Sequence, residues 1–404
     1  MEIGPAGEPL PAGQSLPQRN FVRREEVLIL GASVRAAAHS ALRAGLRPVG
    51  GDLFADRDLC AVCPAYTVPR AHFPGGLEAL AIQLPRGPWL YTGALENHPD
   101  LIARIAHSRP LWGNEGSVVR AVRDPLKVAE TLRAAELPHP AVRINPRGLP
   151  RDASWLIKPL ASAGGRHIVP LTTGRAHLDR PCYYQERIDG TSLSALVLGE
   201  KTGGKLLGVT WQWVGLPDDP FAYRGSIGPW PLTQCQRDRI ERLGRALTSA
   251  FGLVGLFGID LILRDGQPWP VEVNPRYTAS VEVLEMSLGR AFLADHRRAC
   301  DPNAAPHEPA LRDPLPGVVG KVIVFAVKAC TFPDGETGQP SPIDWFQVPR
   351  IADVPHPGTH FERGDPVLTL FAQAPDVPSC KARLQKLQAQ YERRLKCNGA
   401  QLVE

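Results

Sequence analysis

The sequence predicts an α/β fold, and two observations predict this class. The apolar run 27–30 is followed by small apolar residues at helical spacing up to Gly45, and a second strand ends at Asp52. Strand, helix and strand in this order favour a parallel sheet in the N-terminal part of the chain. Further along, the segment 258–273 has the pattern of a β-hairpin, which adds antiparallel strands.

Composition narrows the class of protein. The chain has 404 residues, 43% hydrophobic and 22% charged, which is typical of a globular protein with two or three domains. The net charge of +5 is dispersed, unlike the basic patch of a nucleic-acid binder. No apolar run is long enough to span a membrane, and the eight cysteines follow no disulfide framework. We therefore predict a cytoplasmic enzyme with neither nucleic acid nor a membrane as its partner.

The remaining elements are predicted in chain order. Residues 1–22 lack a continuous apolar stretch and predict a disordered tail rather than a signal peptide. Asp124 and Pro125 form an N-cap and first helical position. Other predicted strands lie at 89–93, 155–158, 166–169, 183–188, 193–198, 205–214, 321–329 and 366–372, and other helices open at 97–99 and cover 232–251 and 379–396. The predicted units are 23–118, 119–300 with a lid part at about 119–184, a linker at 301–318, and a β-rich extension at 319–404.

The hairpin carries the strongest chemical signal. Asp260 and Glu272 lie on its two strands and face the same side if the register pairs them. Asn274 and Arg276 follow Glu272 at intervals of two and therefore share its face. Two carboxylates and an amide oxygen suit Mg²⁺ bound to nucleotide phosphates, and Arg276 is placed to reach a transferring phosphoryl group. The alternative is a solvated face of an edge hairpin.

Two weaker signals precede the hairpin. Lys158 stands in the apolar strand 155–159, and the small residues 161–165 follow it at once. Backbone N–H groups of such a loop can hold phosphates, although a tight hairpin would use the same residues. The strand 183–188 could offer backbone groups and a carboxylate to an adenine edge, or could be an ordinary amphipathic strand.

Three other patterns resemble known motifs and are assigned structural roles. The segment 199–205 has P-loop spacing, but Leu206 stands where Ser or Thr is needed, so we predict a hairpin turn. Gly31 and Asp52 belong to a dinucleotide fingerprint that lacks its second glycine. Cys60 and Cys63 have half the spacing of a zinc knuckle without a second pair.

Taken in order, these motifs resemble those of the ATP-grasp superfamily. The resemblance covers Lys127, WLIKPLASAGG, QERIDG, GIDLIL and VEVNPR, within about 120–285. It implies a Rossmann-like N-terminal domain, a two-subdomain α+β clasp around ATP and a small β-rich C-terminal extension. The implied ATP ligands are Lys127, Lys158, Ser162, Gly164, Gly165, Gln185, Glu186 and Ile188. Magnesium would be held by Asp260, Glu272 and Asn274, with Arg276 and Lys158 as catalytic residues. The acid that often binds ribose is replaced by Thr191 and Ser192.

The resemblance also implies an activity. It predicts an ATP-dependent ligase that activates a substrate carboxylate as an acylphosphate for attack by an amine or similar nucleophile, and it suggests cofactor or peptide biosynthesis as the setting. The partners would be these two small molecules, and the assembly could be a homodimer. Two alternatives stay open: a biotin-carboxylase-like enzyme that activates bicarbonate, and a non-catalytic protein that binds ATP. On the substrate side, one candidate is the segment 223–229, which we expect to be a loop between a strand and a helix and which contains Tyr223 and Arg224. The other candidates are Tyr277 and the segment 33–35.

Overall fold

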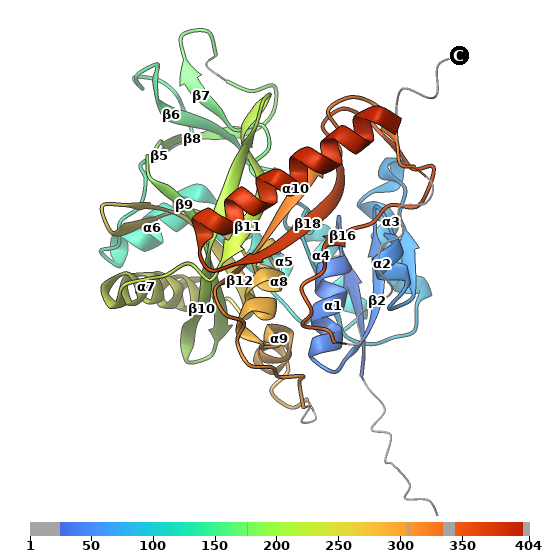
Figure 1. Cartoon of the computed structure of the whole chain (residues 1–404). Coiled ribbons are helices and arrows are strands. Elements are labelled where there is room, and N and C mark those ends of the chain that lie inside the picture. Colours follow the sequence, from blue (N-terminus) through green and yellow to red (C-terminus); the bar gives the residue numbers. More distant parts are fainter. Residues whose placement is uncertain (1–24, 176, 305–307, 334–343, 399–404) are drawn as a thin grey trace, which may run out of the picture.

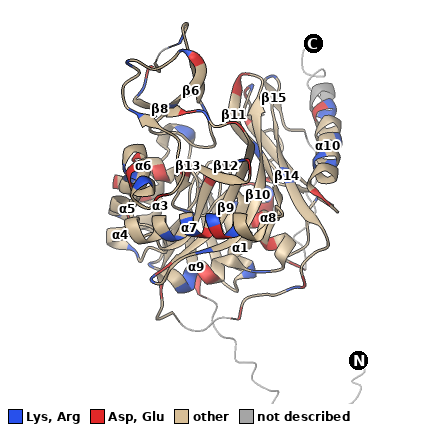
Figure 2. Cartoon of the chain, turned by 90° about the vertical axis from the view of Figure 1, so that its left-hand side faces the viewer, with Lys and Arg blue, Asp and Glu red and all other residues tan. Residues whose placement is uncertain are grey.

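A computed structural model describes residues 25–175, 177–304, 308–333 and 344–398 (Figure 1). The predicted tail 1–22 lies outside these residues. The chain forms three main sheets with helices packed around them, which confirms the predicted α/β class. Basic and acidic residues are interspersed along the ribbon (Figure 2). Within the described ranges, every helix is too short or too polar to cross a membrane.

The N-terminal sheet is parallel, as the βαβ pattern predicts. Its strand order is β3-β2-β1-β4. Side chains of β1 alternate between two cores, with Val27 and Ile29 in one and Leu28 and Leu30 in the other, so both faces of the strand are buried. The elements are β1 (Glu26–Leu30), α1 (Arg35–Arg43), β2 (Arg47–Asp52), α2 (Arg57–Cys60), β3 (Ala65–Thr67), η1 (Arg70–His72), α3 (Gly75–Gln83), β4 (Trp89–Tyr91), η2 (Leu95–Asn97), α4 (Pro99–Ser108) and α5 (Gly116–Val122).

A small four-stranded sheet follows and stands apart from the main body in Figure 1. Helix α6 (Pro125–Ala134) precedes it and begins as predicted, because the Asp124 side chain accepts hydrogen bonds from the backbone N–H groups of Leu126 and Lys127. The predicted returning strand is present but begins at Val169 rather than at 166, since the loop turns through left-handed residues at Gly164, Gly165 and His167 before the strand starts. The strands are β5 (Val142–Arg143), β6 (Asp152–Pro159), β7 (Val169–Thr172) and β8 (Cys182–Glu186), in the order β5-β8-β6-β7.

The large sheet has eight strands in the order β13-β12-β9-β10-β11-β14-β18-β16. The predicted hairpin is present, and its register pairs Asp260 with Glu272. The P-loop-like segment is a hairpin turn, as expected, with Gly203 paired to Glu200. The ranges are β9 (Thr191–Glu200), β10 (Gly203–Leu216), β11 (Asp219–Gly228), α7 (Gln234–Phe251), β12 (Gly255–Arg264) and β13 (Gln267–Asn274).

The segments after the hairpin complete the same body. Strands β14 and β18 extend the large sheet next to β11, and α10 packs on them through Cys380 and Leu384. Figure 1 shows α10 lying across this end of the sheet. The ranges are α8 (Ala279–Leu288), α9 (Phe292–Cys300), β14 (Val318–Phe325), β15 (Cys330–Thr331), β16 (Ile351–Ala352), β17 (His360–Phe361), β18 (Pro366–Ala374) and α10 (Val377–Asn398).

A buried ionic cluster joins the N-terminal sheet, α8 and the C-terminal strands. Glu282 of α8 is fully buried and accepts hydrogen bonds from the guanidinium of Arg35 and, at 3.0 Å, from Nζ of Lys321. Arg35 also donates from Nε to Asp353 Oδ1 at 2.9 Å. The cations outweigh the effect of burial and hold the pKa of Glu282 far below its usual value. One turn further along α8, Glu285 forms a second buried pair with Arg43.

A buried histidine gives the fold a pH dependence that can be measured. His296 accepts a hydrogen bond on Nδ1 from the Leu256 N–H at 2.8 Å, and burial lowers its pKa from 6.5 to about 4. The unfolded chain therefore takes up this proton at a higher pH than the folded chain. The stability due to neutral His296 is complete above pH 6.5 and is lost as the pH falls towards 4.

We expect His296→Asn, which keeps an acceptor for Leu256, to remove this contribution. Between about pH 6 and 4.5, the unfolding free energy of the wild type should fall more steeply than that of the variant, by up to about 1.4 kcal/mol per pH unit. Urea unfolding at a series of pH values measures both slopes. Parallel slopes would show that His296 is protonated in the folded protein.

Candidate functional site

A large cavity lies between the small sheet and the large sheet. Its empty volume, open solvent included, is about 1370 Å³. Most residues predicted for the site line it, although they come from β6, the following loop, β8, β12 and β13. These residues are Lys158, Gly164, Gly165, Gln185, Glu186, Ile188, Asp260, Glu272, Asn274 and Arg276. The fold thus brings together side chains up to about a hundred residues apart.

The predicted oxygen ligands form one group on the hairpin. Asp260 Oδ2 accepts a hydrogen bond from Asn274 Nδ2 at 3.0 Å, and its Oδ1 accepts one from Gln212 Nε2 at 2.8 Å. Burial, and then the nearby charge of Glu272, raise the pKa of Asp260 to about 6. Two partly buried carboxylates side by side are unfavourable unless a cation neutralises them. A cation bound at this group would therefore stabilise both carboxylates.

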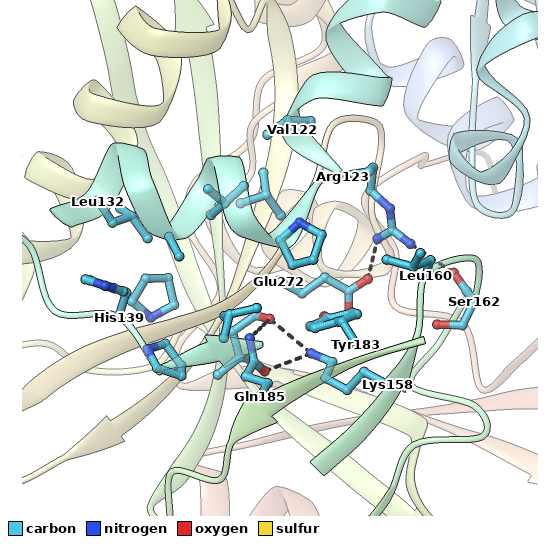
Figure 3. Close-up of a pocket in the computed structure, with 18 of the residues that line it drawn as sticks. Val122, Arg123, Leu132, His139, Lys158, Leu160, Ser162, Tyr183, Gln185 and Glu272 are labelled. Carbon is cyan, nitrogen blue, oxygen red and sulfur yellow. Dashed lines mark hydrogen bonds and ion pairs between the residues drawn. The ribbon is translucent and has the colours of Figure 1, made fainter. Parts of the chain in front are cut away.

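Two cations, Arg123 and Lys158, lie near Glu272, and Figure 3 shows these three side chains. Lys158 is buried and donates from Nζ to Gln185 Oε1 at 3.1 Å and to the Val271 carbonyl at 3.0 Å. Arg123 pairs with Glu272 and reaches the Ser162 carbonyl at 3.3 Å. Burial opposes the charge of Glu272, but Arg123 and Lys158 outweigh it and lower its pKa. Glu272 is therefore ionised at neutral pH.

Arg276 is held by an acid that the sequence did not single out. Its Nη2 lies 2.5 Å from Oε1 of Glu96, which is buried at the C-terminal end of the parallel sheet. Nη2 also lies 3.3 Å from Asn274 Oδ1, while Nε is buried without a hydrogen-bond partner among the described residues. Arg276 thus lines the cavity, its position is fixed by Glu96, and its Nε–H remains available as a donor.

The glycine loop after β6 docks on β11. The Gly164 carbonyl accepts a hydrogen bond from the Tyr223 N–H at 2.8 Å. Gly165 has a φ of +69°, and a Cβ there would lie 2.2 Å from the Phe221 carbonyl oxygen. Only glycine fits at this position without displacing the backbone. The loop can therefore cover the cavity at close range.

Strand β8 of the small sheet, with the residues that follow it, forms one wall of the cavity. Gln185 is buried and donates from Nε2 to the Val271 carbonyl at 3.2 Å, whereas Ile188 supplies an apolar surface. Glu186 accepts a hydrogen bond on Oε2 from the Ala141 N–H at 3.0 Å, which holds its side chain on the small sheet. This wall offers an apolar surface edged by polar groups.

Two predicted residues lie outside the cavity. Ser162 lines a smaller hollow behind it, which shares Lys158, Gln185 and Glu272 as a common wall. Lys127 is exposed on α6 and lines neither hollow. Arg123, at the C-terminal end of the preceding helix α5, supplies the cation next to Glu272. No sequence signal marked Arg123, because an arginine near a helix end is usually solvated.

The substrate-side candidates separate in the structure. Tyr223 lines the cavity, but the segment after it was wrongly expected to be a loop, since it belongs to β11. Arg224 turns away and donates to the Gly215 carbonyl and to Gln388 of α10. Tyr277 is buried and donates to the Ala36 carbonyl at 3.2 Å. Ser33 lines a different cavity.

Two sheets enclose acids, cations and a glycine loop in a clasp-like α/β arrangement. A family model described as "ATP-grasp domain" matches residues 122–280. The chain therefore carries an ATP-grasp domain, which confirms the resemblance noted in the sequence.

Comparisons with individual proteins agree on the fold. The biotin carboxylase domain of Hydrogenobacter thermophilus 2-oxoglutarate carboxylase superposes with a TM-score of 0.66 at 15% identity, covering 90% of this chain and 89% of that one. An L-amino acid ligase from Bacillus licheniformis gives 0.64 at 17% identity, covering 91% and 98%.

In sequence, a formate-dependent phosphoribosylglycinamide formyltransferase of Stenotrophomonas maltophilia is 35% identical over 77 residues, or 19% of this chain. The match covers 20% of that relative's length.

Proposed function

We propose that this protein is an ATP-dependent ligase that activates a carboxylate as an acylphosphate and transfers the acyl group to an amine or similar nucleophile. The observation that carries the proposal is the group of Asp260, Glu272 and Asn274, which lines one cavity together with Lys158 and Arg276. Arg123 pairs with Glu272 from the adjoining smaller hollow. Phosphoryl transfer requires acids that hold the metal ion and cations that bind the phosphate groups. The family match and the two superposed enzymes support the same chemistry.

The oxygen ligands fit magnesium. Asp260, Glu272 and Asn274 offer hard oxygen atoms, and a magnesium ion would take its other ligands from phosphates and water. The raised pKa of Asp260 beside Glu272 marks a site where a divalent cation relieves repulsion between like charges. When bound, magnesium supplies charge neutralisation to the triphosphate.

The chain's own residues would bind and orient the reactants. Lys158 would hold phosphate oxygens, and the loop at Gly164 and Gly165 would close over them and exclude water. Gln185 and Ile188 would hold the adenine. The substrate carboxylate would attack the γ-phosphorus, ADP would leave, and the nucleophile would then displace phosphate from the acylphosphate. Arg276, fixed by Glu96, would stabilise the negative charge on the transferred group.

The cysteines bear on the location of the protein in the cell. The seven cysteines described are all free thiols, which suits a reducing compartment. We propose the cytoplasm as its location and small molecules as its reaction partners.

Binding of ATP with magnesium tests the proposal and separates two cations. At 100 times its dissociation constant, MgATP should stabilise the wild type by about 2.7 kcal/mol. Arg123→Gln should weaken MgATP binding at least about tenfold, because a charge-assisted contact in a desolvated site is lost. Lys127→Gln, which removes the same charge from the exposed side of α6, should leave the dissociation constant unchanged.

Isothermal titration calorimetry and thermal shift measure these constants, with NADH as the control ligand. A protein stabilised by NADH and not by MgATP would contradict the proposal. An equal loss of MgATP affinity in Arg123→Gln and Lys127→Gln would instead show that Lys127 contributes to ATP binding.

A further inference from the structure

A second cavity lies at the C-terminal ends of β1 and β2. Its empty volume is about 950 Å³. Ser33, Phe54 and Thr67 of the N-terminal part line it, and the segment 353–369 closes it from the C-terminal part. Most of its lining is apolar, including Ile323, Phe361 and Leu368. The two parts of the chain therefore enclose a pocket of ligand size.

One carboxylate in this cavity has no hydrogen-bond or ion-pair partner among the described residues. Asp56 lines the cavity with 5% of its surface exposed, and no described residue donates a hydrogen bond to its side chain. It precedes α2 but does not cap it through its side chain. Burial of an ionised group without a partner is costly. Asp56 therefore has no evident role in holding the fold.

The neighbouring acids differ from Asp56 in this respect. Asp52 accepts from the N–H groups of Val34, Phe54 and Ala55. Asp58 accepts at 2.9 Å from the N–H groups of Asp353 and Val354. Asp353 is paired with Arg35. The side chains of these three acids therefore all accept hydrogen bonds from other groups of the protein.

The charge around Asp56 is correspondingly negative. Burial, and then the charges of Asp353, Asp58 and Asp52, raise its pKa well above the ordinary value. Arg35 opposes this effect, but its guanidinium is already shared between Glu282 and Asp353. A cation that entered the cavity would find an uncompensated carboxylate surrounded by apolar surface.

We propose that this cavity binds a small molecule with an amine cation on an apolar body, its amine paired with the Asp56 carboxylate. A charge-assisted hydrogen bond to Asp56 would fix the amine, while Phe54, Phe361 and Leu368 would cover the apolar part. A hydrated metal ion suits the site poorly, because only Asp56 and Asp353 among the lining residues carry carboxylates. The proposal does not depend on ATP binding in the first cavity.

The test uses three probes of similar shape and different charge: 2-phenylethylamine, 2-phenylethanol and 3-phenylpropionate. We expect the amine to raise the melting temperature of the full chain and to bind in calorimetric titrations, the alcohol to bind at least tenfold more weakly, and the anion not to bind. No nucleotide is present, so the result is separate from that of the MgATP test. Equal binding of the three probes would overturn the proposal.

Variants locate the binding. Asp56→Asn keeps the shape and should abolish the preference for the amine, whereas Asp179→Asn, at an exposed position, should retain it. Thr67→Trp, at an exposed position on the cavity lining, should block the amine with Asp56 intact. Amine binding that survives both Asp56→Asn and Thr67→Trp would place it elsewhere and overturn the proposal.

A structural role for Asp56 makes the opposite prediction for stability. If Asp56 were a helix cap, Asp56→Ala would lower the melting temperature of the ligand-free protein. We expect the melting temperature to stay the same or to rise, because the variant removes a buried carboxyl group that accepts no hydrogen bond from any described residue. A clear decrease would assign Asp56 to the fold and overturn the proposal.

Discussion

Glu272→Gln is expected to lower turnover by at least about a hundredfold while the protein stays folded, comparable to the loss of a preorganised electrostatic group. Glu272 lies between Arg123 and the Asp260 carboxylate, on the hairpin that we propose holds magnesium. The substitution keeps the shape of the side chain and removes its charge. Charge at this position should matter most when the phosphoryl group transfers, so kcat should fall rather than only KM rise.

Gln185→Ala is the control for this prediction. Gln185 lies on the same wall of the cavity, 3.1 Å from Lys158 Nζ, but is assigned to the adenine. Its loss should raise KM for ATP with kcat largely kept. Steady-state ADP release, with a carboxylate and an amine found by screening, measures both constants, and circular dichroism checks folding. A folded Glu272→Gln with wild-type kcat would mean that the metal site is elsewhere.

Glu282→Ala should cost about 3–5 kcal/mol of unfolding free energy, since it leaves two buried cations without their shared carboxylate. Arg35 and Lys321 are both buried and both donate to Glu282, which is itself fully buried. The cluster joins three segments that are far apart in the sequence. Its loss should therefore lower the denaturation midpoint of the whole chain.

The matched control is an ion pair on the surface. Asp100 and Arg120 lie 2.7 Å apart with most of both side chains exposed. Asp100→Ala should change stability by no more than about 1 kcal/mol. Urea denaturation of the two variants compares the pairs directly. Similar small losses would show that water reaches the Glu282 cluster.

Local patterns allowed part of the site to be predicted. The hairpin that pairs Asp260 with Glu272 is formed by neighbouring strands, so its alternation could be read from the sequence. Arg123 and Glu96 reach the site from separate helices, and no local spacing connects them to Glu272 or Arg276. Tertiary packing alone brings these four residues together. Lys127 was proposed from the family resemblance, and the structure places it on the exposed face of α6.

Glycine misled the assignment of β11. The sequence around Tyr223 contains Gly225 and Gly228 and has the composition of a loop. In the structure, a Cβ at Gly225 would lie 2.1 Å from the Lys321 carbonyl oxygen. The glycine is therefore a packing requirement where β11 meets β14, not a sign of a turn. Helix α8 was missed for a related reason: Glu282 and Glu285 are buried, so it has no polar face.

The pairing of β11 with β14 has a consequence for the order of synthesis. β11 is complete at Gly228, but its partner begins only at Val318, after a helix, a hairpin and two more helices have been made. Until then, the backbone groups of β11 form an open edge that can pair with other chains. A nascent or truncated chain that ends before Val318 would therefore be prone to aggregation. Strands β14 and β18, which do not line the first cavity, would be needed for the protein to leave the ribosome in a soluble form.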